Sequence, residues 1–192
     1  MNRTLCLKIL YGIILVSLGT IVYWSISNTS KNYHIIIGLL LLIPGRISKY
    51  FYQDFYTGRM YMDKNDFDKA LYYFLKFELC IEEKPWKKAI LWLTWPIYTV
   101  DALAMVKHNI SSIYISKGEY EEAEKYIKDA LSIDNKYPLP YLNLSVINMA
   151  NDKKEEAMNN IKKSIKLGMN NSKVDKIIRN MQSVYANIQS GK

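Results

Sequence analysis

Two stretches of the chain repeat each other at a fixed distance. Residues 109–134 align without a gap with residues 143–168, at a shift of 34 residues. The positions that carry the alignment are Ala123 with Ala157, Ile127 with Ile161 and Leu131 with Ile165. Each stretch predicts two amphipathic helices, with a break at Lys117-Gly118 in the first and at Asn151-Asp152 in the second. Because such units cannot bury their apolar faces alone, they stack on their neighbours, and we expect an all-α fold.

These residues resemble the tetratricopeptide repeat, whose Leu-Gly-x-x-Tyr signature is followed by Ala and then by an aromatic or aliphatic residue. The matching units are Thr57-Gly58, Tyr61, Ala70 and Phe74; Ile110-Ser111, Tyr114, Ala123 and Ile127; and Tyr141, Leu144-Ser145, Ala157 and Ile161. Asn148 replaces the tyrosine of the third unit, and all three units lack the family's terminal proline in place. The resemblance implies a short α-solenoid of helix–turn–helix repeats, in which the first helix of each pair lines a concave wall that binds peptides or partner helices.

The spacing of the units indicates an insert. Ala70 and Ala123 are 53 residues apart, which is one repeat of 34 plus 19 residues. We expect a repeat at 51–84, an apolar helical insert at 85–104, two repeats at 105–171 and a capping helix at 172–192. The capping helix would begin at Ser172, and its apolar face comprises Val174, Ile177, Ile178, Met181, Val184, Tyr185 and Ile188.

The insert is rich in tryptophan. Its tryptophans are Trp86, Trp92 and Trp95, and residues 89–100 carry no charge. Two interpretations are open from the sequence. The segment either contacts a membrane surface, as tryptophan-rich and lysine-rich segments do, or adds a pair of core helices hinged at Pro96.

Residues 1–50 predict a membrane anchor. Between Lys8 and Lys31 lie 22 residues without a charge, enough helix to span roughly 30 Å of hydrocarbon. Tyr23 and Trp24 lie at the end of its apolar part, Ile9–Ile26, and such rings favour the membrane interface. A second apolar run, Tyr33–Gly45, is shorter. We expect two transmembrane helices in a hairpin; the alternatives are a cleavable signal peptide for the first run and an interfacial or core helix for the second.

Basic residues orient this predicted hairpin. Arg3, Lys8, Arg46 and Lys49 lie on one side of it, and Lys31 lies in its loop. Because basic residues stay on the cytoplasmic side of a membrane, both ends of the hairpin are expected in the cytoplasm. The sequence thus predicts a multi-pass protein of the cell membrane with a cytoplasmic repeat domain. If the first run alone crossed, the repeats would lie outside.

Patterns typical of catalysis are missing from the sequence. Of the formal net charge of +8, residues 1–50 hold +5, so the rest lacks the dense basic face of nucleic-acid-binding proteins. The chain has no glycine-rich phosphate motif, and His34 and His108 are too few for a metal site. Cys6 and Cys80 form no CxxC pair. We expect neither enzymatic activity nor a cofactor.

The inner wall of the repeats is the candidate binding surface. Helical spacing places on it Phe55, Arg59, Met62, Met105, His108, Ser112, Ile115, Leu139, Leu142, Val146 and Met149. Relatives that hold a terminal carboxylate use paired Lys and Asn residues, of which only Asn109 is matched. A mostly apolar wall suits a peptide or an amphipathic helix of a partner protein. The alternative occupants are the chain's own insert and a second copy of the chain.

These expectations combine into a membrane-tethered interaction protein that recruits or assembles a protein partner at the cytoplasmic face. Its N-terminal helices would contact lipid, with Tyr23, Trp24, Trp86, Trp92 and Trp95 as interface residues. The alternative is a structural subunit of a larger membrane complex, such as an export, envelope or sporulation assembly. In that case the repeats would act as a spacer.

Overall fold

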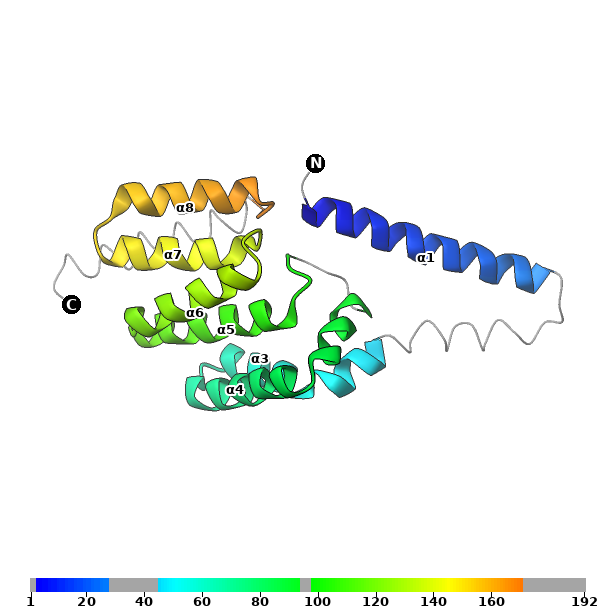
Figure 1. The fold of residues 1–192 in the computed structure, drawn as a ribbon, viewed down its shortest axis with the longest axis horizontal. Helices are drawn as coiled ribbons and strands as arrows, with labels where there is room; N and C mark the ends of the chain where they lie inside the picture. The colour runs from blue at the N-terminus through cyan, green and yellow to red at the C-terminus, as the bar shows by residue number, and fades with distance from the viewer. Residues whose placement is uncertain (1–2, 28–44, 94–97, 171–192) are drawn as a thin grey trace.

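The computed structural model describes residues 3–27, 45–93 and 98–170. Figure 1 shows that the repeat region is a stack of helix pairs, in which α3 packs with α4, α5 with α6 and α7 with α8. Their bounds are α3 Gln53–Asp63, α4 Phe67–Glu83, α5 Ala102–Lys117, α6 Tyr120–Ile133, α7 Pro138–Ala150 and α8 Lys154–Lys166. The predicted all-α fold with paired antiparallel helices is confirmed. Residues 45–51 are also helical and lead into α3.

The turn inside each pair has the same construction. Asn65, Gly118 and Asp152 have φ angles of 59°, 77° and 58° and lie at equivalent repeat positions. Glycine, asparagine and aspartate are the residues that enter this left-handed region most readily. In the middle pair the Gly118 N–H donates to the Ile115 carbonyl at 3.0 Å, which closes the end of α5. The predicted breaks at Lys117-Gly118 and Asn151-Asp152 are therefore confirmed.

Small residues let the two helices of each pair approach closely. Ala70, Ala123 and Ala157 are at most 1% exposed. The partner position on the first helix is Gly58, Ser111 or Ser145, and all three are buried. Glycine occurs in the pair that has the bulky Phe74, and serine occurs where isoleucine stands instead, at Ile127 and Ile161. The sizes of facing residues thus compensate within each pair, as close packing requires.

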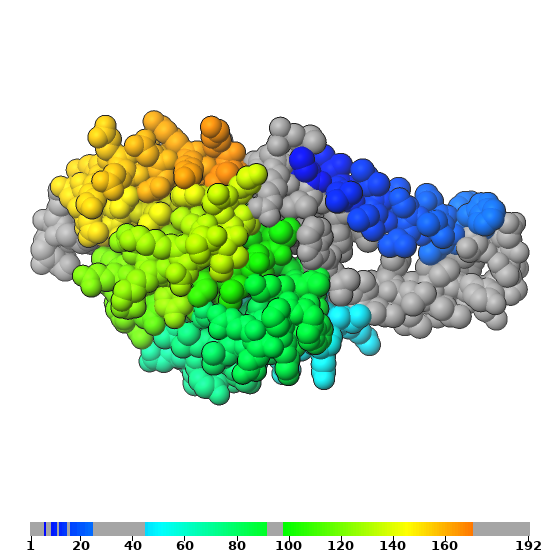
Figure 2. Space-filling model, in the orientation of Figure 1, coloured from blue at the N-terminus to red at the C-terminus, as the bar shows by residue number. Residues whose placement is uncertain are grey.

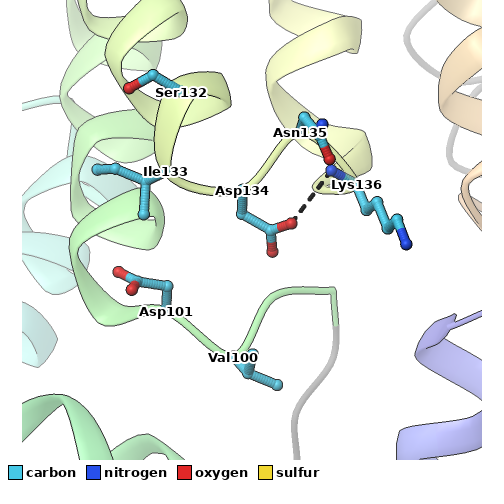
Figure 3. Close-up of a pocket in the computed structure, with 7 residues that line it drawn as sticks. All are labelled: Val100, Asp101, Ser132, Ile133, Asp134, Asn135 and Lys136. Carbon is cyan, nitrogen blue, oxygen red and sulfur yellow. Dashed lines mark hydrogen bonds between the residues drawn. The ribbon is translucent and has the colours of Figure 1, made fainter.

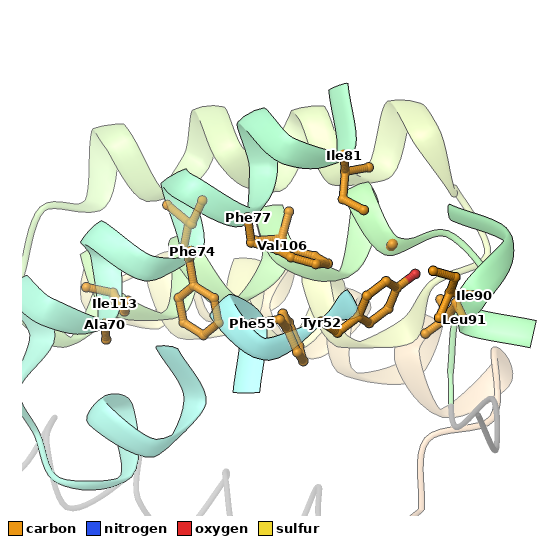
Figure 4. Packing of buried hydrophobic residues seen from close by; sticks show 12 residues of the cluster. Tyr52, Phe55, Ala70, Phe74, Phe77, Ile81, Ile90, Leu91, Val106 and Ile113 are labelled. Atoms are coloured by element: carbon orange, nitrogen blue, oxygen red, sulfur yellow. The ribbon is translucent and has the colours of Figure 1, made fainter. Parts of the chain in front are cut away.

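The largest core cluster joins the first two pairs. Figure 4 shows the rings of Tyr52, Phe55, Phe74 and Phe77 gathered between helices, with Ile90 and Leu91 beside Tyr52. The Tyr52 hydroxyl donates to the Lys87 carbonyl at 2.8 Å. Because this bond and the ring contacts bury Tyr52 to 1% exposure, they fix the insert against the first pair.

The insert begins with a 3₁₀ helix, η1, at Pro85–Leu93. Ile90 and Leu91 are buried in the core, in agreement with the interpretation that the insert packs on the repeats. Trp86 is 58% exposed and packs edge-on against Phe51, with ring centroids 5.3 Å apart. The insert therefore combines a buried face with an exposed tryptophan.

A nearly buried ion pair connects the first pair to the second. The Lys107 Nζ on α5 lies 2.5 Å from the Glu78 Oε1 on α4, and the two side chains are 13% and 10% exposed. The Asp129 carboxylate on α6 lies 3.4 Å from the same nitrogen. Hydrogen bonding and the two carboxylates raise the pKa of Lys107, against the opposing effect of its burial. One ammonium group thus bridges three helices.

The N-terminal helix α1, Arg3–Ser27, lies apart from the stacked pairs in Figure 1. The sequence predicted a membrane span here; among the residues that the structure describes, however, no helix is found with both the length and the apolar character of a span. The second predicted span and the capping helix at 172–192 lie largely or entirely outside the described residues.

Candidate functional site

The first helices of the three pairs, together with the residue that precedes α7, contribute a cluster of polar side chains that we call the inner polar cluster: Arg59, His108, Ser112, Tyr137 and Asn143. The Asn143 Nδ2 on α7 lies 3.2 Å from the His108 Nδ1 and donates to the Ser112 Oγ at 3.0 Å, both on α5. The same nitrogen donates to the buried Ser111 Oγ at 2.8 Å. The Tyr137 ring packs edge-on against His108, with centroids 5.4 Å apart. Neighbouring repeats are thus joined by hydrogen bonds on one side of the stack.

The electrostatics of this cluster favour a neutral histidine. Burial, together with the positive charge of Arg59, lowers the pKa of His108 to about 3. Burial raises the pKa of Tyr137 above its usual range, and the Arg59 charge acts in the opposite direction. At neutral pH the imidazole is uncharged, so it places no charge beside the Asn143 amide, whose two hydrogens go to the Ser111 and Ser112 hydroxyls. Arg59, which is exposed, supplies the charge of the cluster.

A second surface feature follows the length of α7. Leu139, Leu142, Val146 and Met149 recur at helical spacing, and we call them the inner stripe. They belong to one apolar cluster with Ile161, Met169 and Tyr98. Leu142 is 2% exposed, and the other three are half-buried. The structure therefore brings together the four predicted wall residues of the third repeat.

The remaining predicted wall residues are distributed among the core clusters. Phe55 is 5% exposed and packs with the phenylalanine rings of α4. Met62 and Met105 are half-buried against the same cluster, and Ile115 packs against the cluster between the second and third pairs. Arg59 and Phe55 also line an open pocket of about 540 Å³ on α3, with Tyr56, Met60, Asp63 and Lys64.

Sequence reasoning did not select Asn143 or Tyr137. The available signal was position, since Asn143 follows Leu139 by four residues on the same helix and therefore faces the same side. Of the predicted membrane-interface residues, Tyr23, Trp24 and Trp86 are 74%, 70% and 58% exposed. The side chains of Trp92 and Trp95 lie outside the described part of the chain.

A pocket of about 400 Å³ lies where the insert meets the end of α6. Figure 3 shows the carboxylates of Asp101 and Asp134 on two sides of it. Both already make structural hydrogen bonds: Asp101 accepts from the Leu103 N–H at 2.8 Å at the start of α5, and Asp134 accepts from the Thr99 hydroxyl at 2.7 Å. Within the described residues, no group of three metal-ligating side chains occurs.

Comparison with known proteins supports one of the predicted repeats, the middle one. The tetratricopeptide repeat family matches residues 106–137, which comprise α5 from Val106 onward, α6 and the turn that leads to α7. No curated protein matches the chain. Three of the five residues of the inner polar cluster therefore come from a segment that matches a known repeat, and a tetratricopeptide repeat indicates protein partners.

Proposed function

We propose that this chain is a protein-interaction module whose stacked repeats bind a segment of a partner protein on the side formed by α3, α5 and α7. The observation that carries the proposal is the inner polar cluster. It draws side chains from all three first helices, beside the half-buried apolar residues of the inner stripe. A mixture of hydrogen-bonding groups, one cation and apolar side chains is what an amphipathic helix or peptide needs for recognition.

The exposed residues of the cluster are the ones to test, because Leu142 and Phe55 belong to the core. Arg59→Glu reverses the charge of the cluster at an exposed position. Lys162→Glu on α8 makes the same charge change at another exposed position and serves as the matched control. Circular dichroism establishes that both variants retain the helical content of the natural chain.

The assay is quantitative cross-linking and co-purification from the native cell. The proposal expects a protein captured by the natural chain and by Lys162→Glu, and lost or strongly reduced with Arg59→Glu. Equal recovery of the same proteins with all three chains would contradict the proposal. The working surface would then be elsewhere, as expected for a structural subunit that uses its repeats as a spacer.

We further propose that the N-terminal segment holds the repeats at the cytoplasmic face of the cell membrane. The support is the run of 22 uncharged residues after Lys8 and the exposure of the apolar side chains in α1. Examples are Ile13 at 56%, Val16 at 67% and Ile21 at 61%. Contact with lipid would remove this apolar surface from water, and anchoring would raise the effective concentration of partners in the same membrane.

Fractionation tests the attachment. Ile13→Lys combined with Val16→Lys should move the chain from membranes to the soluble fraction. Tyr72→Lys with Leu79→Lys, at exposed positions of α4, should leave it in place. Retention of the α1 variant after a high-salt wash would refute attachment through α1 and would direct attention to the exposed Trp86. Protease digestion of sealed vesicles of known orientation then reports on which side the repeats lie.

A further inference from the structure

The three helix pairs can be compared position by position, because their turns and close contacts are equivalent. Met60 on α3 corresponds to Ile113 on α5 and to Ile147 on α7, at the repeat shifts of 53 and 34 residues. Ile113 is 0% exposed in a cluster with Ala70, and Ile147 is 2% exposed in a cluster with Ala123. Each isoleucine therefore packs against the second helix of the preceding pair, as neighbouring repeats do.

The same position is open on the first pair. Figure 2 shows this pair at one end of the stack and the third pair at the other. Met60 is 43% exposed, and so is Tyr56, one turn earlier on α3. Both residues line the open pocket of about 540 Å³ on α3. Position 60 thus exposes an apolar side chain where the two equivalent positions bury one under a helix.

The described residues that precede α3 approach it from its end. Residues 45–51 are helical, and the chain continues in helical hydrogen bonding into α3: the Tyr52 N–H donates to the Ser48 carbonyl at 2.9 Å, and the Tyr56 N–H donates to the Tyr52 carbonyl at 3.0 Å. In the third pair, by contrast, α6 precedes α7 and lies alongside it. A segment that enters α3 end-on cannot take the place that α6 takes beside α7.

A lysine at the edge of this face indicates the charge of a helix that would fit it. Lys64 corresponds to Lys117, whose Nζ lies 2.8 Å from the Asp68 Oδ1 in the first turn of the preceding helix α4. Among the described residues, Lys64 is exposed and forms no ion pair. Asp63 also lines the pocket, but its equivalent, Ser116, is exposed, so this position lies outside the covered face. A docked helix with a carboxylate in its first turn would give Lys64 the partner that Lys117 has.

We propose that the face of α3 around Met60 binds an α-helix of a partner protein. The partner helix carries a carboxylate in its first turn and small or apolar residues over the next two turns. Within the chain, α4 and α6 have this pattern where they cover the next pair: Asp68 precedes Ala70 in α4, and Glu121 precedes Ala123 in α6. The face belongs to α3 alone, at the end of the array, so this inference goes beyond the proposed function and can fail without it.

A peptide of this class provides the test. The probe is a fluorescently labelled synthetic peptide of residues 119–134, which spans α6 and includes Glu121. Its binding to the full-length chain is measured by fluorescence anisotropy. Met60→Asp places a charge on the face, and Leu79→Asp makes the matched change at a position of α4 that is 60% exposed. Circular dichroism establishes that both variants retain the helical content of the natural chain.

The charge pair is tested by a reciprocal exchange. Lys64→Glu in the chain should weaken binding of the natural peptide about fivefold, as expected for an exposed ion pair. Combining it with Glu121→Lys in the peptide should restore the affinity. This comparison keeps the proposal falsifiable even if Met60→Asp disturbs folding.

The proposal expects the natural chain and Leu79→Asp to bind the peptide equally, and Met60→Asp to bind it at least tenfold more weakly. No binding to the natural chain, or the same loss in Met60→Asp and Leu79→Asp, would overturn the proposal. Sedimentation velocity tests the remaining occupant. If the natural chain self-associates and Met60→Asp abolishes the association, a second copy occupies the face and the assignment to a partner helix is wrong.

Discussion

Replacing Gly58 with alanine sets two effects against each other. Gly58 lies inside α3, where alanine is ordinarily the better helix former by about 1 kcal/mol. A Cβ atom built at this position would lie 2.9 Å from both Cδ1 and Cε1 of Phe74 and 3.2 Å from its Cγ. Phe74 has 0% exposure and packs against Phe55, with ring centroids 5.6 Å apart. The ring therefore has little room to move away.

The structure decides the sign of the net change. Overpacking a filled core costs about 1–3 kcal/mol, which exceeds the gain in helix propensity. We expect Gly58→Ala to lower the free energy of unfolding by about 1 kcal/mol, or the melting temperature by about 2–4 °C. In a Phe74→Leu background the clash is removed, so the same substitution should become stabilising by up to about 1 kcal/mol. The coupling between the two sites is then about 2 kcal/mol.

The assay is a double-mutant cycle in which unfolding by urea is monitored by circular dichroism at 222 nm. The natural chain, both single variants and the double variant are measured under the same conditions. If Gly58→Ala stabilises the natural chain, the size compensation between facing helices does not operate as described. An unchanged effect in the Phe74→Leu background would equally refute the reasoning, since the cost would then come from something other than the ring.

Three further predictions concern charge and capping. Lys107→Met should destabilise the chain by about 3 kcal/mol, because the Glu78 carboxylate keeps its burial and loses its cation, and adding Glu78→Leu should recover most of this loss in urea melts. For His108, the unfolded chain binds a proton below about pH 6.5, whereas the folded chain binds it only near pH 3. The free energy of unfolding therefore decreases as the pH is lowered from 6.5 toward 3, by at most about 1.4 kcal/mol per pH unit. In His108→Gln, the melting temperature should depend less on pH between pH 7 and 5 than it does in the natural chain. Equal pH dependence in the two chains would argue against the burial of a neutral imidazole. Asp101→Ala should cost about 1 kcal/mol because it removes the cap of α5, whereas Asp101→Asn should retain most of that stability in the same melts.

The helix pairs were predictable because local chemistry and packing agree. The breaks at Lys117-Gly118 and Asn151-Asp152 follow from residues that tolerate a left-handed backbone. Asp66 precedes α4 and accepts a hydrogen bond from the Lys69 N–H at 3.3 Å, as an N-terminal cap does. The pairing of Gly58 with Phe74 was not predictable, because it depends on which side chains meet across the pair and not on spacing along one helix.

For the candidate site, the sequence could predict only which side of each helix faces it. Helical spacing identifies the side of α7 that carries Leu139, Leu142 and Met149, but it cannot distinguish an open wall from a covered one. The structure shows Leu142 buried, and it adds Asn143, whose amide joins two repeats. For the insert, composition favoured neither of the two interpretations decisively. Burial of Leu91 on one side and exposure of Trp86 on the other arise from tertiary packing.

The ion pair between Lys107 and Glu78 has a consequence for how the array comes apart. Repeat arrays behave as units joined by nearest-neighbour couplings, and each junction contributes its own free energy. Charge contributes to the first junction, where Lys117 and Asp68 add a second, exposed pair at 2.8 Å. At the second junction, apolar contacts and the neutral Asn143 amide join the units. Because salt screens exposed charges more than buried ones, a higher ionic strength should weaken the Lys117–Asp68 pair while it largely spares Lys107–Glu78, and it should loosen the α4–α5 junction more than the second junction.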